Sequence, residues 1–121
     1  MANISNSTSN TLIDGSSGAD YIENKSYNVT IFAYNGNDTI SNSGSSYVEK
    51  IYINAGKGND SIYSSGSDYC DYLTVYGGEG NDTIFVDSRH NSAYSLIDGG
   101  TDNDMISVNN SPLQYNSWRR R

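Results

Sequence analysis

Five aspartates recur along the chain, each at the end of a short segment rich in Gly and Asn. The intervals between them are 18, 22, 22 and 22 residues, and the five are Asp20, Asp38, Asp60, Asp82 and Asp104. The segment 77–82, for example, reads Gly-Gly-Glu-Gly-Asn-Asp. Glycines allow positive φ angles, so such turns can direct backbone carbonyls inward. Carboxylate and carbonyl oxygens are the ligands that hard cations such as Ca²⁺ take in proteins. The pattern therefore predicts oxygen-rich cation sites.

Two aliphatic columns keep the same register as these aspartates. An isoleucine lies two positions after each Asp: Ile22, Ile40, Ile62, Ile84 and Ile106. Another aliphatic residue lies two positions before each six-residue segment: Ile13, Ile31, Ile53, Val75 and Ile97. Apolar residues alternate around them with Thr, Ser, Tyr and Asn, which is typical of half-buried strands. Each unit is therefore expected to be strand, Gly/Asp turn, strand and second turn.

Stacking of these units determines the predicted fold, because one short strand pair cannot bury its own apolar face. We expect an all-β fold, a right-handed parallel β-solenoid (β-roll) of about five coils. The solenoid is predicted over residues 11–107, with residues 1–10 as an N-terminal extension or cap and residues 108–121 as a C-terminal cap or tail. The first unit is shorter only in its second turn, so the Gly/Asp turn of constant length is the better candidate for chemistry.

Charge and composition exclude several classes of protein. The chain of 121 residues has 14 acidic and 7 basic residues, a net charge of −7, and three of the basic residues are at 119–121. Nucleic-acid binding would require the opposite sign. One Cys and one His cannot build an intramolecular disulfide or a multi-thiolate zinc site. The sequence contains no apolar run long enough for a transmembrane helix, and residues 1–10 do not have the pattern of a cleavable signal.

The turn pattern Gly-Gly-x-Gly-x-Asp followed by x-Ile resembles the RTX (hemolysin-type) calcium-binding nonapeptide family. Residues 77–85 match its nine-residue consensus in full, and five copies in register extend over roughly residues 11–107. The resemblance implies a parallel β-roll with Ca²⁺, up to about four ions, held between adjacent loops on one edge. It implies that the Asp carboxylates and loop carbonyls are the ligands. The candidate metal-site residues are the five aspartates with Asp102, and Gly15, Gly18, Gly36, Gly56, Gly58, Gly77, Gly78, Gly80, Gly99 and Gly100.

The spacing of the coils supports a cation independently of the resemblance. Corresponding aspartates in successive coils would lie about 4.8 Å apart, the distance between neighbouring strands. Carboxylates at that spacing repel strongly unless a cation lies between them. A metal-free alternative is that the loops are plain turns, stabilised by a ladder in which stacked asparagines satisfy each other's amides. That column is Asn37, Asn59, Asn81 and Asn103.

The chain departs from the family pattern in two respects. Only one turn of each coil carries the nonapeptide, so a coil has about 22 residues and one edge is expected to lack metal. The loops are also unequal, since consensus glycines are replaced by Ser16, Ala33, Tyr34, Ala55 and Asp102. We therefore expect the gaps between loops to differ in calcium affinity. The expected order from strongest to weakest is Asp60/Asp82 with Asp82/Asp104, then Asp38/Asp60, then Asp20/Asp38.

Aromatic residues suggest a second use of the scaffold. By strand alternation, the side chains of Tyr52, Tyr76, Tyr63 and Phe85 are expected to point outward. Such a face can stack on a glycan or bind a partner protein, and tyrosine also simply suits an exposed strand. The unpaired strands at the two ends of a solenoid offer a different alternative, end-to-end self-association.

These observations predict a calcium-binding structural module rather than an enzyme, with folding coupled to the metal. The only constellation that suggests catalysis, Asp87 with Arg89 and His90, occurs in one copy in a single turn. The resemblance implies a bacterial secreted or cell-surface protein, since RTX repeats usually accompany large exported proteins. The predicted location is extracellular or at the cell surface, without a cleavable N-terminal signal in this chain. No nucleic acid and no membrane span are expected.

Overall fold

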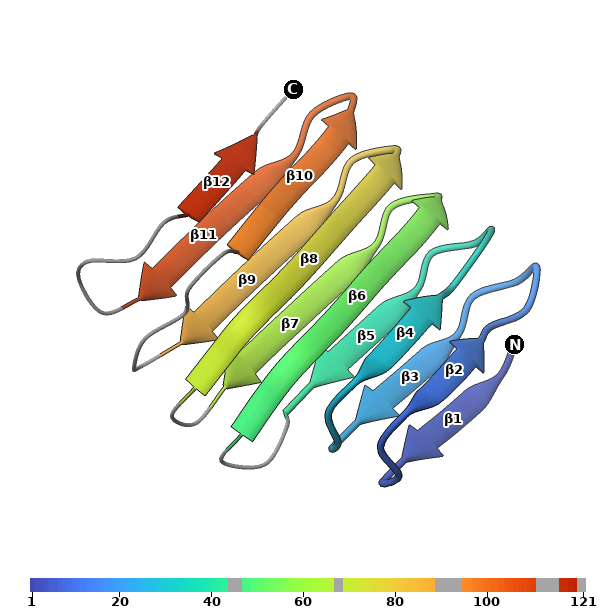
Figure 1. Ribbon diagram of the computed structural model, residues 1–121. Coiled ribbons are helices and arrows are strands. Elements are labelled where there is room, and N and C mark those ends of the chain that lie inside the picture. The colour runs from blue at the N-terminus through green and yellow to red at the C-terminus, as the bar shows by residue number, and fades with distance from the viewer. Residues whose placement is uncertain (44–46, 67–68, 89–94, 111–115, 120–121) are drawn as a thin grey trace.

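The computed structural model describes residues 1–43, 47–66, 69–88, 95–110 and 116–119. The described residues form twelve β-strands and no helix, arranged as two sheets of six strands (Figure 1). The first sheet, sheet A, consists of β1 (Asn3–Asn6), β3 (Tyr21–Asn24), β5 (Thr39–Asn42), β7 (Ser61–Gly66), β9 (Thr83–Ser88) and β11 (Met105–Asn110). The second sheet, sheet B, consists of β2 (Thr11–Asp14), β4 (Val29–Phe32), β6 (Tyr47–Lys57), β8 (Tyr69–Glu79), β10 (Ser95–Thr101) and β12 (Asn116–Arg119).

Strand pairing confirms the predicted parallel β-solenoid. Each strand pairs in parallel with the strand two further along the chain, so consecutive strands belong to opposite sheets. The register follows the sequence repeat, with Ile62 opposite Ile40 on one side and Ile84 on the other. The five Gly/Asp turns connect strands of sheet B to strands of sheet A, and they line one edge of the molecule, at the upper right of Figure 1.

The core lies between the two sheets and consists mainly of the predicted aliphatic columns. All ten of these residues are at most 7% exposed. Val29, Ile51 and Leu73 add a third column on sheet B, and Ala33 and Ala55 fill the space at the loop edge. A chain with little apolar mass can build this core because stacking hides each inward side chain under its copy in the next coil.

One inward column was not anticipated from the sequence. It begins with three buried asparagines and one buried serine and ends with valines, in the order Asn6, Asn24, Asn42, Ser64, Val86 and Val108. Polar residues at core positions must have hydrogen-bond partners, and here each finds them in the neighbouring coil.

The sheets extend beyond the five-loop repeat at both ends. β1 pairs with β3 and adds a strand to sheet A, and β12 pairs with β10 and adds a strand to sheet B. Residues 3–6 and 116–119 therefore continue the two sheets over the terminal coils of the repeat, with Trp118 opposite Ile97.

Candidate metal centre

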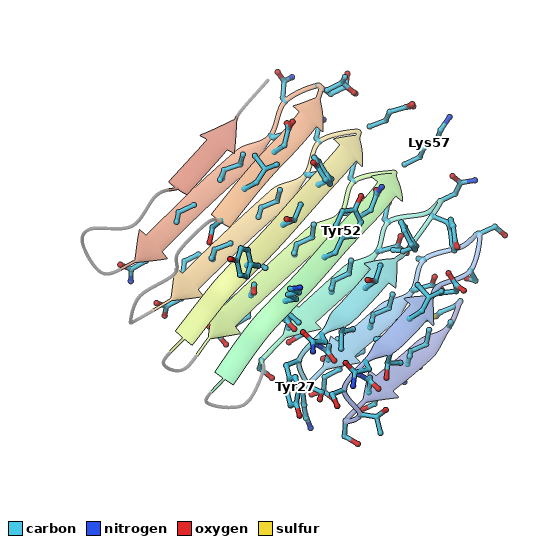
Figure 2. All side chains as sticks on the ribbon, viewed as in Figure 1. Tyr27, Tyr52 and Lys57 are labelled. Carbon is cyan, nitrogen blue, oxygen red and sulfur yellow. The ribbon has the colours of Figure 1, made fainter. Side chains whose placement is uncertain are left out.

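The Gly/Asp loops stack on one another through backbone hydrogen bonds. The N–H of Gly36 donates to the carbonyl of Lys57 (2.9 Å), and the N–H of Gly58 donates to the carbonyl of Glu79 (2.8 Å). Lys57 is at the outer rim of this edge in Figure 2 and forms an exposed ion pair with Glu79 (3.6 Å). The loops are thus in direct contact from coil to coil, so a group placed on one loop faces the next.

Two of the consensus glycine positions are required by backbone conformation. Gly58 has a φ of +129°, and a Cβ there would overlap the carbonyl oxygen of Gly36 in the preceding coil. Gly78 has a φ of +110°, and a Cβ there would overlap the carbonyl oxygen of Gly56. Only glycine adopts a positive φ at little cost, and only glycine has no Cβ that would clash with the neighbouring coil. The same holds at Gly36, Gly56, Gly80 and Gly100.

At two of these positions, the residue that replaces glycine is strained. Tyr34 has a φ of 77° and Asp102 a φ of 78°, in the left-handed region that non-glycine residues seldom adopt. The Asp102 carboxylate takes over a loop contact, since its Oδ2 accepts from the N–H of Gly80 (3.0 Å). Tyr34 donates its hydroxyl to Oδ1 of Asp14 (2.6 Å). In the second and fifth loops, side-chain hydrogen bonds of Tyr34 and Asp102 therefore offset part of the backbone strain.

The structure brings the five predicted aspartates into one column. In the second to fifth loops, one carboxylate oxygen of the aspartate, Oδ1, accepts from the backbone N–H of the Asp in the preceding coil. The bonds are Asp20 to Asp38 (2.8 Å), Asp38 to Asp60 (2.8 Å), Asp60 to Asp82 (2.9 Å) and Asp82 to Asp104 (3.0 Å). This ladder was missed from the sequence, and it gives each stacked carboxylate a donor that offsets part of its burial.

The second oxygen of most of these carboxylates has no partner. Among the described residues, Oδ2 is buried and without a hydrogen bond in Asp38, Asp60, Asp82 and Asp104. In the fifth loop it lies close to the first loop residue, because a Cβ on Gly99 would be 2.5 Å from Oδ2 of Asp104. A buried carboxylate oxygen without a donor is costly. In each of these four loops, a cation or a proton beside Oδ2 would remove the cost of burying this oxygen without a partner.

The acidity of the aspartates reflects this environment. Burial raises the pKa of Asp60 to about 7, and the carboxylates of Asp82 and Asp38 add to the shift, while the Asp38 N–H opposes it. Burial raises the pKa of Asp82 to about 6, with Asp104 and Asp102 adding to it. The pKa of Asp38 is also raised, chiefly by burial. Without metal, the middle of the column thus retains protons at a pH at which aspartate is normally ionised.

Asp20, in the first loop, behaves in the opposite way. Its Oδ2 accepts from the N–H of Ser16 (2.6 Å), and its Oδ1 accepts from the Ser16 hydroxyl (2.5 Å) and from the N–H of Ala2 (2.6 Å). Burial raises its pKa, but these hydrogen bonds outweigh it and lower the pKa on balance. Both oxygens of this carboxylate are therefore satisfied by the protein itself.

The predicted asparagine column is present but is bonded differently from the prediction. Oδ1 of Asn37 accepts from the backbone N–H of Asn59 (2.8 Å), and the same contact joins Asn59 to Asn81 and Asn81 to Asn103. The idea that the side-chain amides pair with each other was wrong, because the strand spacing brings the backbone N–H of the next coil within reach first. The Asn ladder and the Asp ladder accept from opposite directions along the solenoid.

The donors at this edge fit calcium better than a transition metal. They are carboxylate and backbone oxygens, which Ca²⁺ prefers. Within the described ranges, no group of three or more His, Cys, Asp or Glu side chains comes together to hold a metal. Each gap between loops offers carboxylates from one column only, so carbonyl oxygens would have to complete the coordination shell.

The four predicted partner-binding aromatics do not form one surface. Tyr52 lies on sheet B (Figure 2), and the ring centroid of Tyr76, in the neighbouring strand β8, is 5.8 Å from that of Tyr52. Tyr63 and Phe85 are stacked on sheet A, with centroids 5.2 Å apart. Phe32, which was not singled out from the sequence, extends the first group because its ring is 5.8 Å from that of Tyr52. Arg89 and His90 lie outside the described residues.

Comparison with known proteins agrees with this geometry. Stacked Gly/Asp turns along one edge of a parallel β-solenoid define the β-roll class. The model of the RTX calcium-binding nonapeptide repeat matches in four copies, over residues 14–44, 52–71 and 74–88, and the chain belongs to this family. The fifth loop, with Asp102 in place of a glycine, lies outside the matched residues.

No curated protein and no solved structure gives a significant match to the chain. In the part of the chain that the structure describes, no helix is long and apolar enough to cross a membrane.

Proposed function

We propose that the chain is a calcium-binding structural module of a bacterial secreted or cell-surface protein, and that its folding is coupled to Ca²⁺. The observation that carries the proposal is the row of four buried, unpartnered Oδ2 atoms in the second to fifth loops. When bound, calcium supplies positive charge to carboxylates that the fold has already removed from water. Without it, the loops must either keep protons or leave buried charges unpaired.

Each aspartate has a distinct part in this proposal. Asp38, Asp60, Asp82 and Asp104 hold calcium through the oxygen that has no protein donor, while the other oxygen keeps the neighbouring loop in place. Carbonyls of the loop glycines complete the shell. The gap between Asp60 and Asp82 and the gap between Asp82 and Asp104 bind calcium best. The gap between Asp20 and Asp38 binds least, because Asp20 has donors of its own.

Circular dichroism with and without EGTA tests calcium coupling. We expect EGTA to reduce the β-sheet signal and to lower the melting temperature by about 10 °C or more, because a site occupied at 100 times its Kd contributes about 2.7 kcal/mol. Excess CaCl₂ should restore both, and MgCl₂ at the same concentration serves as the control. An unchanged spectrum and melting temperature after chelation would refute the proposal.

The proposed role is structural and not catalytic. The family that the chain belongs to is defined by calcium-binding repeats, and the buried ionisable groups at the loop edge are aspartates whose hydrogen bonds join one coil to the next. Export is part of the proposal: the chain would stay poorly ordered where calcium is scarce and fold outside the cell. We also propose that residues 1–10 and 108–121 act as caps of the solenoid formed by residues 11–107.

Glycan binding is a second candidate function, favoured by the outer face of sheet B. A shallow hollow of about 460 Å³ lies there beside Tyr52, and its lining combines aromatic, amide and hydroxyl groups: Asn28, Thr30, Lys50, Tyr52, Tyr72 and Thr74. Aromatic faces stack on sugar rings, and the polar groups can bond to hydroxyls. A glycan array with the Tyr52→Ala variant tests this, with Tyr63→Ala on the opposite sheet as the control.

End-to-end association remains the third candidate. The outermost strands of the described sheets are β1 and β11 in sheet A, and β2 and β12 in sheet B. Such edges can pair with another chain. Light scattering on addition of calcium distinguishes a monomeric module from a filament, since only the filament gives an apparent molecular mass that grows with protein concentration.

A further inference from the structure

We propose that the N-terminal coils, β1 to β5, are held together without calcium, by hydrogen bonds between protein groups in addition to apolar packing, and form a calcium-independent template on which the later coils become ordered. The inference rests on the proposed calcium coupling. It divides the chain into N-terminal coils that are ordered without calcium and later coils that need calcium to become ordered. Two independent features of the N-terminal coils support this division: a buried ladder of amides and a carboxylate that needs no metal.

The ladder runs through the interior of the first coils. Nδ2 of Asn6 donates to Oδ1 of Asn24 (2.8 Å), Nδ2 of Asn24 donates to Oδ1 of Asn42 (2.7 Å), and Nδ2 of Asn42 donates to Oγ of Ser64 (3.0 Å). All four residues are buried. Each bond joins adjacent coils, so the ladder crosses the gaps between coils that calcium is proposed to bridge elsewhere.

Short loops complete the hydrogen bonding of the ladder. The second Nδ2 hydrogen of Asn24 is donated to the carbonyl of Ser26 (2.9 Å), and that of Asn6 to the carbonyl of Thr8 (2.8 Å). Oδ1 of Asn6, which has no coil before it, accepts from the hydroxyl of Thr8 (2.8 Å). A buried polar network that is fully satisfied stabilises one arrangement, whereas a partly satisfied one does not. Thr8 therefore closes the ladder at its N-terminal end.

The ladder stops at Ser64. The next positions of the same column are Val86 and Val108, which add apolar contact but no directional bond between coils. The change from polar to aliphatic side chains falls between β7 and β9. The coils after it also contain the fourth and fifth loops, in which Asp82 and Asp104 each have an unpartnered Oδ2.

The first loop adds the second feature. Ser16 and Ala2 satisfy both oxygens of Asp20, and the N–H of Asp20 is bonded in turn to Oδ1 of Asp38. Among residues 1–43, the only buried carboxylate oxygen without a partner is thus Oδ2 of Asp38. In a solenoid, each coil contacts only its neighbours, so order can propagate from a stable coil to the next. Ordered N-terminal coils would present an edge to which the following coil adds once calcium is bound.

Hydrogen exchange of the full chain, measured with CaCl₂ and with EGTA, tests the inference. In EGTA, the amides of Ile22 and Ile40 should remain at least about 10-fold more protected than those of Ile84 and Ile106, because local opening follows the stability of each unit. Calcium should raise the protection of Ile84 and Ile106 by about 100-fold or more and change that of Ile22 by less than about 3-fold.

Matched variants at one column separate the ladder from general packing. Asn24→Ala should lower the protection of β3 and β5 in EGTA to the level of β9. Val86→Ala, in the same column beyond the ladder, should lower the protection of β9 and β11 in calcium and leave the N-terminal coils in EGTA unchanged. If Asn24→Ala does not fold, Ser16→Ala replaces it, since that change removes one hydroxyl donor to Asp20 and keeps the backbone donor.

The possible results distinguish the two proposals. If all coils exchange rapidly in EGTA and all are protected by calcium, the template is refuted and calcium coupling stands. If exchange is the same with and without calcium, calcium coupling is refuted and the template with it. If Asn24→Ala, or Ser16→Ala in its place, leaves the N-terminal protection in EGTA unchanged, the hydrogen-bonded template is refuted.

Discussion

The first Gly/Asp loop and the four that follow share a motif but differ in the state of the carboxylate. In the first loop, three donors from Ser16 and Ala2 satisfy Asp20, and its pKa is lowered. In the third loop, one oxygen of Asp60 has no partner, and burial raises the pKa of Asp60 to about 7. The aspartate in a nonapeptide does not by itself indicate a metal ligand, because its neighbours decide whether it lacks a donor.

The residue at the second loop position explains much of the difference. Gly56 and Gly78 have positive φ there, whereas Ser16 does not and directs both its N–H and its hydroxyl at Asp20. A glycine at the same position has no hydroxyl to offer. The substitution that weakens the first loop as a consensus repeat is therefore the one that makes its carboxylate independent of metal.

The largest expected contrast is between two glycines at equivalent loop positions. Gly58→Ala should destabilise the protein by about 3 kcal/mol or more, because φ is +129° and the new Cβ overlaps a backbone carbonyl. Gly18→Ala should change stability by less than about 1 kcal/mol, since φ there is not positive and the nearest atom, the Met1 nitrogen, is 3.5 Å from the new Cβ. Thermal melts in calcium measure both, and equal losses would show that the first loop is packed like the others.

The second contrast concerns the aspartates themselves. Asp82→Ala should lower the melting temperature in calcium by about 10 °C or more, because that residue borders two gaps, and should have a much smaller effect in EGTA. Asp20→Ala should lower it by less, and by the same amount with and without calcium, because its partners are protein groups. Equal effects of the two variants in calcium would contradict the ranking of the gaps.

The third prediction concerns pH. Since the pKa values of Asp60 and Asp82 are raised in the metal-free fold, that fold binds more protons than the unfolded chain. Stability in EGTA should therefore be highest near the ordinary aspartate pKa of about 4 and should fall as the pH rises from there through about 6 to 7. Saturating calcium should remove this decline. Melting curves in EGTA at several pH values measure it, and a melting temperature that rises over this range would contradict the raised pKa values.

The smallest expected effect is at the fifth loop. Asp102→Gly should stabilise the metal-free protein by about 1 kcal/mol, because it relieves a non-glycine residue at a φ of 78°. It also removes one of the carboxylates that raise the pKa of Asp82. The lost contact to the Gly80 N–H can be replaced by a backbone carbonyl, as in the preceding loops. A melting temperature below that of the original protein would show that the Asp102 contact outweighs the strain.

Much of the fold could be predicted from the sequence because the coils are periodic. The interval of 22 residues places Ile40, Ile62 and Ile84 in one buried column. Residues one repeat apart in the sequence come into contact because successive coils stack directly on one another. The buried ladder through Asn24 and Asn42 could have been found from the same register, since the column four positions after each loop Asp reads Asn, Asn, Ser, Val and Val. It was missed because the alternation of apolar residues with Thr, Ser, Tyr and Asn was taken to place the polar residues of the strands on the outward face.

The sequence by itself determined the class of this protein: a solenoid with an acidic row of Gly/Asp loops on one edge. Only the tertiary structure decided which carboxylates have donors and which of them lack a charge. That depends on atoms from adjacent coils, such as the N–H of Ala2 reaching Asp20. Hydrogen-bond satisfaction within a stack depends on backbone orientation to within a fraction of an ångström, and residue spacing does not specify that orientation.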